Sequence, residues 1–99
     1  MNIQQMMKQA QKMQAEMTRR QEELAAKTYE AQSGGGMVTA TINGKQELVS
    51  LAIDPEIVKQ GDVAMIQDLV IAAVNEGIHK VQEEARNLMS GMMGSLGGI

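Results

Sequence analysis

Hydrophobic residues in the first third of the chain recur at alternating spacings of three and four. The positions are Ile3, Met6, Ala10, Met13, Met17 and Leu24, with Arg20 interrupting the series. This is the a/d pattern of a coiled coil, which places these side chains in one seam along a helix. The residues between them are mainly Gln, Lys, Glu, Arg and Ala, which are good helix formers. The pattern therefore predicts one long helix over residues 2–32.

A run of three glycines at residues 34–36 follows Ser33. Glycine ends helices readily, because it adopts the left-handed C′ conformation without steric cost. A phosphate-binding loop needs the opposite order, in which a strand precedes the glycines and a helix N-terminus follows them. No Gly-Lys-Ser/Thr sequence follows this run. We therefore interpret the glycines as a joint between a helix and a strand, not as a nucleotide site.

Alternating side chains after the glycines predict a β-hairpin. Residues 37–42 alternate apolar residues with threonine, and the Asn-Gly pair at 43–44 is the preferred sequence for a two-residue type I′ turn. Residues 45–53 form the return strand. This turn would place Val38 opposite Val49 and produce one apolar face that needs a cover.

Two helical segments follow the hairpin. Asp54-Pro55 fits an N-cap followed by proline in the first turn, which predicts a short helix through Lys59. Asp62 caps a second long helix that continues to about Met89. Its apolar positions keep helical spacing throughout, at Ile66, Leu69, Val70, Ala73, Val74, Ile78, Val81, Ala85 and Leu88.

These elements predict one α+β domain over residues 1–99. It consists of a long N-terminal helix, a small antiparallel β-hairpin or sheet, a short helical turn and a long C-terminal helix. Residues 90–99 contain four glycines and no charge, which predicts a flexible tail.

The composition favours a homodimer. A chain of 99 residues buries a limited fraction of its surface. Two amphipathic helices and an apolar hairpin face offer more apolar surface than one such chain can bury by itself. Tyr29 is the only aromatic residue, whereas ten methionines supply adaptable apolar volume. The chain has no N-terminal apolar segment of the secretory type and no apolar run of about 18 residues, so we expect a cytoplasmic protein without a membrane span.

Catalysis is poorly supported by the residue types present. The absence of cysteine excludes disulfides, thiolate catalysis and cysteine-based zinc sites. His79 is the single histidine and lies among charged neighbours on a helix, which is typical of a solvated position. The adjacent carboxylates at residues 83–84 point in different directions around that helix. We therefore predict no enzyme activity, no catalytic residue, no metal, no cofactor and no small-molecule substrate.

The charge is segregated along the chain. The net charge of -3 does not by itself favour nucleic acid, because affinity for the DNA backbone comes from cations that displace counterions. Residues 1–20, however, contain four cations against the single acid Glu16, whereas residues 33–99 contain four cations against eight acids. At about 100° per residue, Lys8, Lys12 and Arg19 fall within about 40° of one another, opposite the apolar seam. Arg20 lies beside them.

This cationic stripe has three interpretations. It could contact phosphates, with Gln4, Gln5 and Gln11 as additional hydrogen-bond donors. On the pattern alone an ordinary solvated helix face is favoured, since acids lie near the stripe. A membrane-surface helix is less favoured, because the same methionine face would be needed both for packing against another helix and for contact with the membrane.

Two stretches of the sequence resemble the YbaB/EbfC family of bacterial nucleoid-associated proteins. They are "GGGMVTATINGKQELVSLAIDPEIV" and "IQDLVIAAVNEGIHKVQEEA", and the opening "MMKQAQKMQAEM" extends the similarity over almost the whole chain. The resemblance implies a tweezer-like homodimer, in which two long helices per subunit project from a central β body, and a DNA-binding function in the nucleoid. At position 77 this chain has glycine where relatives usually have alanine, and a glycine inside a helix is unfavourable.

Two functions of different classes remain open. The first is a DNA-binding nucleoid-associated protein that contacts duplex DNA through Lys8, Lys12, Arg19 and Arg20. The second is a protein-interaction module, such as a prefoldin-like helical clamp, which the acidic total charge and the methionine seam favour. If DNA is the partner, backbone contact and DNA shape are favoured over base readout, because no aromatic stacking platform, zinc finger or helix-turn-helix is evident.

Overall fold

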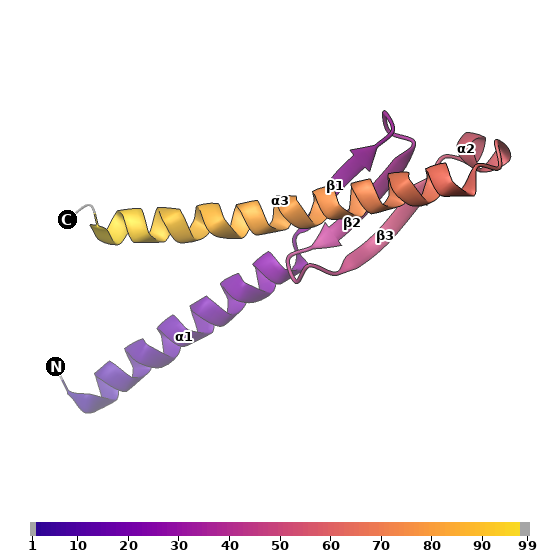
Figure 1. Cartoon of the computed structure of the whole chain (residues 1–99). Helices are drawn as coiled ribbons and strands as arrows, with labels where there is room; N and C mark the ends of the chain where they lie inside the picture. The colour runs from indigo at the N-terminus through magenta and orange to yellow at the C-terminus, as the bar shows by residue number, and fades with distance from the viewer. Residues whose placement is uncertain (1, 98–99) are drawn as a thin grey trace.

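The computed structural model describes residues 2–97, with side chains described for residues 2–91. The described chain forms three helices and one antiparallel sheet, and the strands lie in the order β1-β2-β3 (Figure 1). In chain order the elements are α1 (Ile3–Ala26), β1 (Thr28–Ser33), β2 (Val38–Asn43), β3 (Leu48–Ile53), α2 (Pro55–Lys59) and α3 (Val63–Gly97). The predicted α+β class is confirmed.

The first helix is shorter than predicted, and residues 28–33 form a strand instead. The helix ends at Ala26, and Lys27 already has extended backbone angles (φ -63, ψ 137). Strand β1 pairs with β2 along its whole length, with Ala31 opposite Ala40. The prediction of helix through residue 32 was wrong because pairing with β2 overrides the helical propensity of these residues.

The glycine run is therefore a joint between two strands, not between a helix and a strand. Gly34, Gly35 and Gly36 have φ values of 61, 67 and 96, a conformation that side-chain-bearing residues rarely adopt. The backbone N–H of Gly36 donates to the carbonyl oxygen of Ser33 at 3.2 Å, which closes the turn.

The second hairpin also differs from its prediction. Its loop is longer than two residues: Asn43 Oδ1 accepts from the N–H groups of Lys45 and Glu47, and the left-handed residue is Gln46, with φ 63. Val38 consequently pairs with Ile53, and a register irregularity lies between Thr41 and Ile42. The two-residue turn and the Val38–Val49 pairing were wrong, since the side chain of Asn43 organises a wider turn.

The core is a thin layer between the sheet and α3. Its buried residues are Ala31, Val38, Ala40 and Ile42 from the sheet, Ile57 from α2, and Ala73 and Val81 from α3. Helix α3 packs on β1 and β2, so β3 is left at the margin of the layer. As a result Leu48, Val49 and Leu51 of β3 stay exposed, and we call these three residues the β3 patch.

The predicted helix starts are confirmed. Asp54 Oδ1 accepts from the N–H of Glu56 at 2.9 Å, and Pro55 opens α2. Asp62 Oδ1 accepts from the N–H of Met65 at 3.0 Å and caps α3. Helix α3 then continues past Met89 to Gly97, beyond the predicted end. Flexibility of residues 90–99 stays a prediction, and residues 98–99 lie outside the described chain.

The two long helices project from the sheet as arms. Helices α1 and α3 extend from the sheet on the same side and diverge, so that both termini lie at one end of the molecule (Figure 1). No residue of α1 is buried. The radius of gyration is 20.2 Å, against about 13 Å for a compact domain of this length. Much of the chain therefore lies outside the core.

Gly77 allows α3 to lie close to β2. A Cβ atom at this position would be 2.6 Å from Cγ1 of Ile42, whose side chain is fully buried. The glycine that looked unfavourable inside a helix is therefore explained by packing.

We expect Gly77→Ala to lower the free energy of unfolding by about 1–3 kcal/mol, because the overlap with Ile42 outweighs the gain in helix propensity of about 1 kcal/mol. Gly91→Ala is the matched control, since nothing lies within 4 Å of a Cβ atom there. It should leave stability unchanged or raise it. Urea unfolding measures both, and equal stability of the two variants would contradict the packing role.

Candidate nucleic-acid interface

Helix α1 carries the predicted cationic stripe on an exposed face. Lys8, Lys12 and Arg19 are all exposed, and no acid interrupts residues 3–15. Asn2 caps the helix by accepting from the N–H of Gln5 at 2.8 Å. The cations closest to the free end of α1 are Lys8 and Lys12, which lie on a solvated helix.

Lys8 and Lys12 are available for an external partner. Three ion pairs are present in the part of the chain that the structure describes, and neither lysine takes part in them. Arg19, by contrast, lies 3.9 Å from Glu23 one turn along the helix. Exposed pairs of this kind are weak, so Arg19 can exchange its partner at little cost.

Polar side chains surround Lys8 and add hydrogen-bonding groups to the stripe. A surface depression is lined by Lys8 and by Asn2, Gln4, Gln5, Met7 and Gln11. Amide groups donate two hydrogen bonds each, and amides and lysines commonly contact phosphate oxygens. The free end of α1 therefore combines positive charge with neutral donors.

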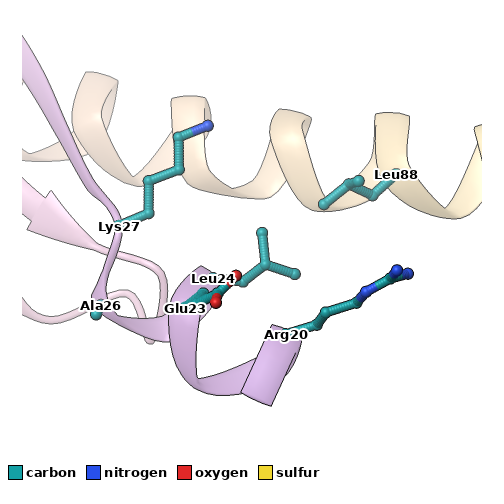
Figure 2. Close-up of a pocket in the computed structure, with 6 residues that line it drawn as sticks. All are labelled: Arg20, Glu23, Leu24, Ala26, Lys27 and Leu88. Carbon is teal, nitrogen blue, oxygen red and sulfur yellow. The ribbon is translucent and has the colours of Figure 1, made fainter. Parts of the chain in front are cut away.

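Arg20 lies on a different face of α1 from the other three cations. It lines an open pocket of about 720 Å³ between the end of α1 and α3, together with Leu24 and Leu88. Figure 2 shows Leu24 and Leu88 pointing toward each other across this pocket. Arg20 occupies the interrupting position of the apolar seam, so the structure does not group it with Lys8, Lys12 and Arg19.

The apolar seam of α1 is uncovered along its whole length. Its large side chains are Ile3, Met6, Met13, Met17 and Leu24, which we call the α1 seam. Their exposed fractions run from 41% at Leu24 to 74% at Ile3. Because Leu24 faces α3, the seam lies on the inner side of the arm and the cationic stripe lies outside.

The junction between α1 and β1 is held by residues that the sequence did not reveal. Lys27 Nζ is 2.9 Å from Oε1 of Glu84 on α3 and 5.2 Å from the centroid of the Tyr29 ring. Lys80 Nζ donates to the carbonyl oxygen of Glu30 at 2.7 Å. Lys27 and Glu84 are 57 residues apart, and no local pattern signals such a pair.

The Lys27–Glu84 pair has a defined pH dependence. The hydrogen bond to Glu84, followed by the negative charge of Glu84, raises the pKa of Lys27 above its ordinary value of 10.5. A raised pKa means that the stabilisation from the positive charge of Lys27 is fully present below the ordinary value and is lost only as the pH rises through the raised value. The contact is therefore complete at neutral pH.

His79 is exposed on α3. Among the described residues, no three His, Asp or Glu side chains come together in a way that could hold a metal ion. None of the described helices is long and apolar enough to cross a membrane.

Comparison with known proteins gives consistent matches over nearly the full chain. The model of the YbaB/EbfC DNA-binding family matches residues 1–96. A nucleoid-associated protein of Acetivibrio thermocellus is 49% identical over 98 residues, which cover 99% of this chain and 87% of that protein. A nucleoid-associated protein of Moorella thermoacetica is 52% identical over 95 residues, which cover 96% of this chain and 91% of that protein.

One solved structure extends the similarity to the fold. The crystal structure of an uncharacterized protein from Helicobacter pylori superposes with a TM-score of 0.70 at 32% sequence identity. The match covers 95% of this chain and 99% of that chain.

Proposed function

This chain belongs to the YbaB/EbfC DNA-binding family, and we propose that it binds duplex DNA as a homodimer through contacts from α1 to the phosphate backbone. Relatives named nucleoid-associated proteins support a DNA-binding role in the nucleoid, in its organisation or in gene regulation. The observation that carries the proposal is the division of α1 into an outer cationic stripe and an inner apolar seam.

The outer face of α1 supports contact with DNA at its free end. Lys8 and Lys12 lie about three and about two turns from Arg19, so the three cations follow the helix axis as one line. Lys8 and Lys12 make no ion pair within the described residues, so contact with phosphate would not first break a bond inside the protein. Cations in this arrangement neutralise phosphates and release counterions.

Contact with the backbone is favoured over base reading. The stripe combines lysines with Gln4, Gln5 and Gln11, which are suited to phosphate and sugar oxygens. Tyr29, the single aromatic residue, lies in β1 against α3 and is half-buried, so it offers no stacking platform on the arm. Binding should therefore depend weakly on base sequence.

Exposed apolar surface supports the homodimer. The α1 seam and the β3 patch are both uncovered in a single chain, although monomeric proteins rarely leave large contiguous apolar patches in water. A second copy could cover either surface with the same surface of its own, as a two-fold axis requires. Two α1 helices would then present two cationic stripes.

The uncovered seam also favours a second candidate, the prefoldin-like clamp. Met6, Met13 and Met17 are each more than half-exposed and have the flexibility typical of surfaces that bind varied partners. Suppression of the aggregation of an unfolded client protein tests this function. Loss of that activity in Met13→Asp, with DNA affinity absent in the wild type, would favour the clamp over DNA binding.

The DNA proposal predicts a steep salt dependence that the outer cations determine. The logarithm of the binding constant falls with the logarithm of salt concentration by about 0.9 per phosphate neutralised. Lys12→Gln removes one cation from each subunit, so we expect the slope to flatten by up to about two units in a dimer. Fluorescence anisotropy titrations of a duplex at several salt concentrations measure this slope.

Lys45→Gln is the matched control, since Lys45 lies in the loop between β2 and β3. It should leave the slope nearly unchanged. If Lys12→Gln kept the wild-type salt slope while Lys45→Gln flattened it, the result would indicate that DNA binds at the sheet and not at α1.

The homodimer predicts concentration-dependent association that the α1 seam controls. Met13→Asp places a charge in the seam and should shift sedimentation equilibrium toward monomer by at least about tenfold in dissociation constant, since a buried unpaired charge is costly. Gln11→Asp adds the same charge on the outer side and should leave the equilibrium close to wild type. A stable folded wild-type monomer at micromolar concentration would contradict the dimer.

A further inference from the structure

Helix α1 is attached to the rest of the chain at one end only. Its body has no buried residue. Among the described residues, the hydrogen bonds that connect α1 or its cap to other elements all involve Ala25 or Lys27. The direction of a helix of 24 residues is therefore decided at its C-terminal end, which we call the α1 root.

The first contact at the root is a close approach of backbone to backbone. The N–H of Gly44 donates to the carbonyl oxygen of Ala25 at 3.2 Å. A Cβ atom at Gly44 would overlap the carbonyl group of Leu24 and lie 3.0 Å from the Cα of Ala25. Since φ of Gly44 is not positive, this glycine is required by the proximity of α1 and not by the turn.

The second contact ties the root to the other arm. The Lys27 ammonium bonds to Glu84 at 2.9 Å and lies above the Tyr29 ring. Lys80, one turn earlier on α3, holds the carbonyl oxygen of Glu30 at 2.7 Å and so fixes the start of β1. Exposed ion pairs contribute little to folding stability, so the main consequence of these contacts is geometric.

Small movements at the root are amplified along the arm. At 1.5 Å per residue, Lys8 lies about 27 Å from Ala26 and Arg19 lies about 10 Å from it. A rotation of about 10° at the root would move Lys8 by about 5 Å but Arg19 by only about 2 Å. A hydrogen bond to phosphate does not survive a displacement of about 5 Å. The distal cations are thus the ones most sensitive to the root.

We propose that Glu84, by holding Lys27, and Gly44, by seating the end of α1, set the angle between α1 and α3 and so position Lys8 and Lys12 on the DNA backbone. Glu84 is a positioning residue that increases DNA affinity although DNA repels its charge. The positioning of the arm is independent of DNA, whereas its effect on affinity rests on the proposed function.

The angle can be measured without DNA. The chain contains no cysteine, so Ala15→Cys on α1 and Ser90→Cys on α3 would accept spin labels at those two sites alone. Labelled chains diluted with excess unlabelled chain would report the distance within one subunit by double electron–electron resonance. We expect Glu84→Gln and Gly44→Ala to broaden or shift the distance distribution by several ångströms, with α3 and the sheet still folded by circular dichroism.

Glu83→Gln is the matched control for this measurement. It makes the same change of charge on the adjacent residue, which takes part in no ion pair within the described residues. Its distance distribution should equal that of the unsubstituted protein. If Glu84→Gln and Gly44→Ala gave the same distance distribution as Glu83→Gln, the role of the root would be overturned.

The sign of the effect on DNA binding separates positioning from charge. Loss of a negative charge alone should tighten binding or leave it unchanged, as we expect for Glu83→Gln. Glu84→Gln should instead weaken binding by about threefold or more and flatten the salt slope, because distal phosphate contacts are lost. Tighter binding by Glu84→Gln would overturn the positioning role.

A double substitution tests whether Glu84 acts through the distal cations. If it does, Lys8→Gln should change the salt slope less in the Glu84→Gln protein than in the wild type. Fully additive effects would overturn this route. If the wild type bound no DNA, the proposed function would fail together with the effect on affinity, while the distance measurements would still decide whether the root sets the arm angle.

Discussion

The close packing of α3 on β2 through residues with short side chains is the contact on which the rest of the structure depends. Ala73 and Gly77 of α3 face Ala40 and Ile42 of β2, and all four are buried. The short side chains of Ala40 and Ala73 and the missing side chain of Gly77, against which Ile42 packs, let the helix and the sheet approach closely.

This thin core determines how far the helices project. Helix α3 has 35 residues, and only its first part packs on the sheet, so its C-terminal part extends beyond β1 and β2. Helix α1 does not enter the core at all, and its direction depends on the few groups at its root. A protein with a larger globular core would cover these helices, and the arms would not exist.

The sequence predicted the elements that local chemistry determines. The α1 seam, the cap at Asp54 and the cap at Asp62 each have a signal within a few residues, and the structure contains all three features. Strand β1 was missed because Glu30 and Gln32 resemble helix formers. These residues form a strand because they pair with β2. The only local signals for a strand were Thr28 and Tyr29, whose residue types favour strands.

Non-local contacts explain the remaining errors. The Asn-Gly pair suggested a tight turn, yet Gly44 is needed because the end of α1 lies against it, which no local rule can reveal. The grouping of Lys8, Lys12 and Arg19 followed from helical geometry alone. Arg20 was predicted to contact DNA beside them, although it occupies a seam position, and in the structure it instead lines the pocket between α1 and α3. Lys27 and Glu84 had no sequence signal, because only the fold brings them together.

The elongated shape also explains how an acidic chain can offer a cationic surface. Electrostatic interactions between exposed charges are largely screened beyond about 8 Å at physiological salt. Glu16, the nearest acid along α1, is about 12 Å along the helix axis from Lys8 and about 6 Å from Lys12, and the longest dimension of the molecule is 71 Å. The acids of α3 and of the loops at the sheet therefore contribute little to the potential at the free end of α1. The net charge of -3 is a sum over regions that salt screens from one another. At the free end of α1 a DNA backbone would meet two lysines, Lys8 and Lys12, and of these only Lys12 has an acid, Glu16, within the screening distance along the helix.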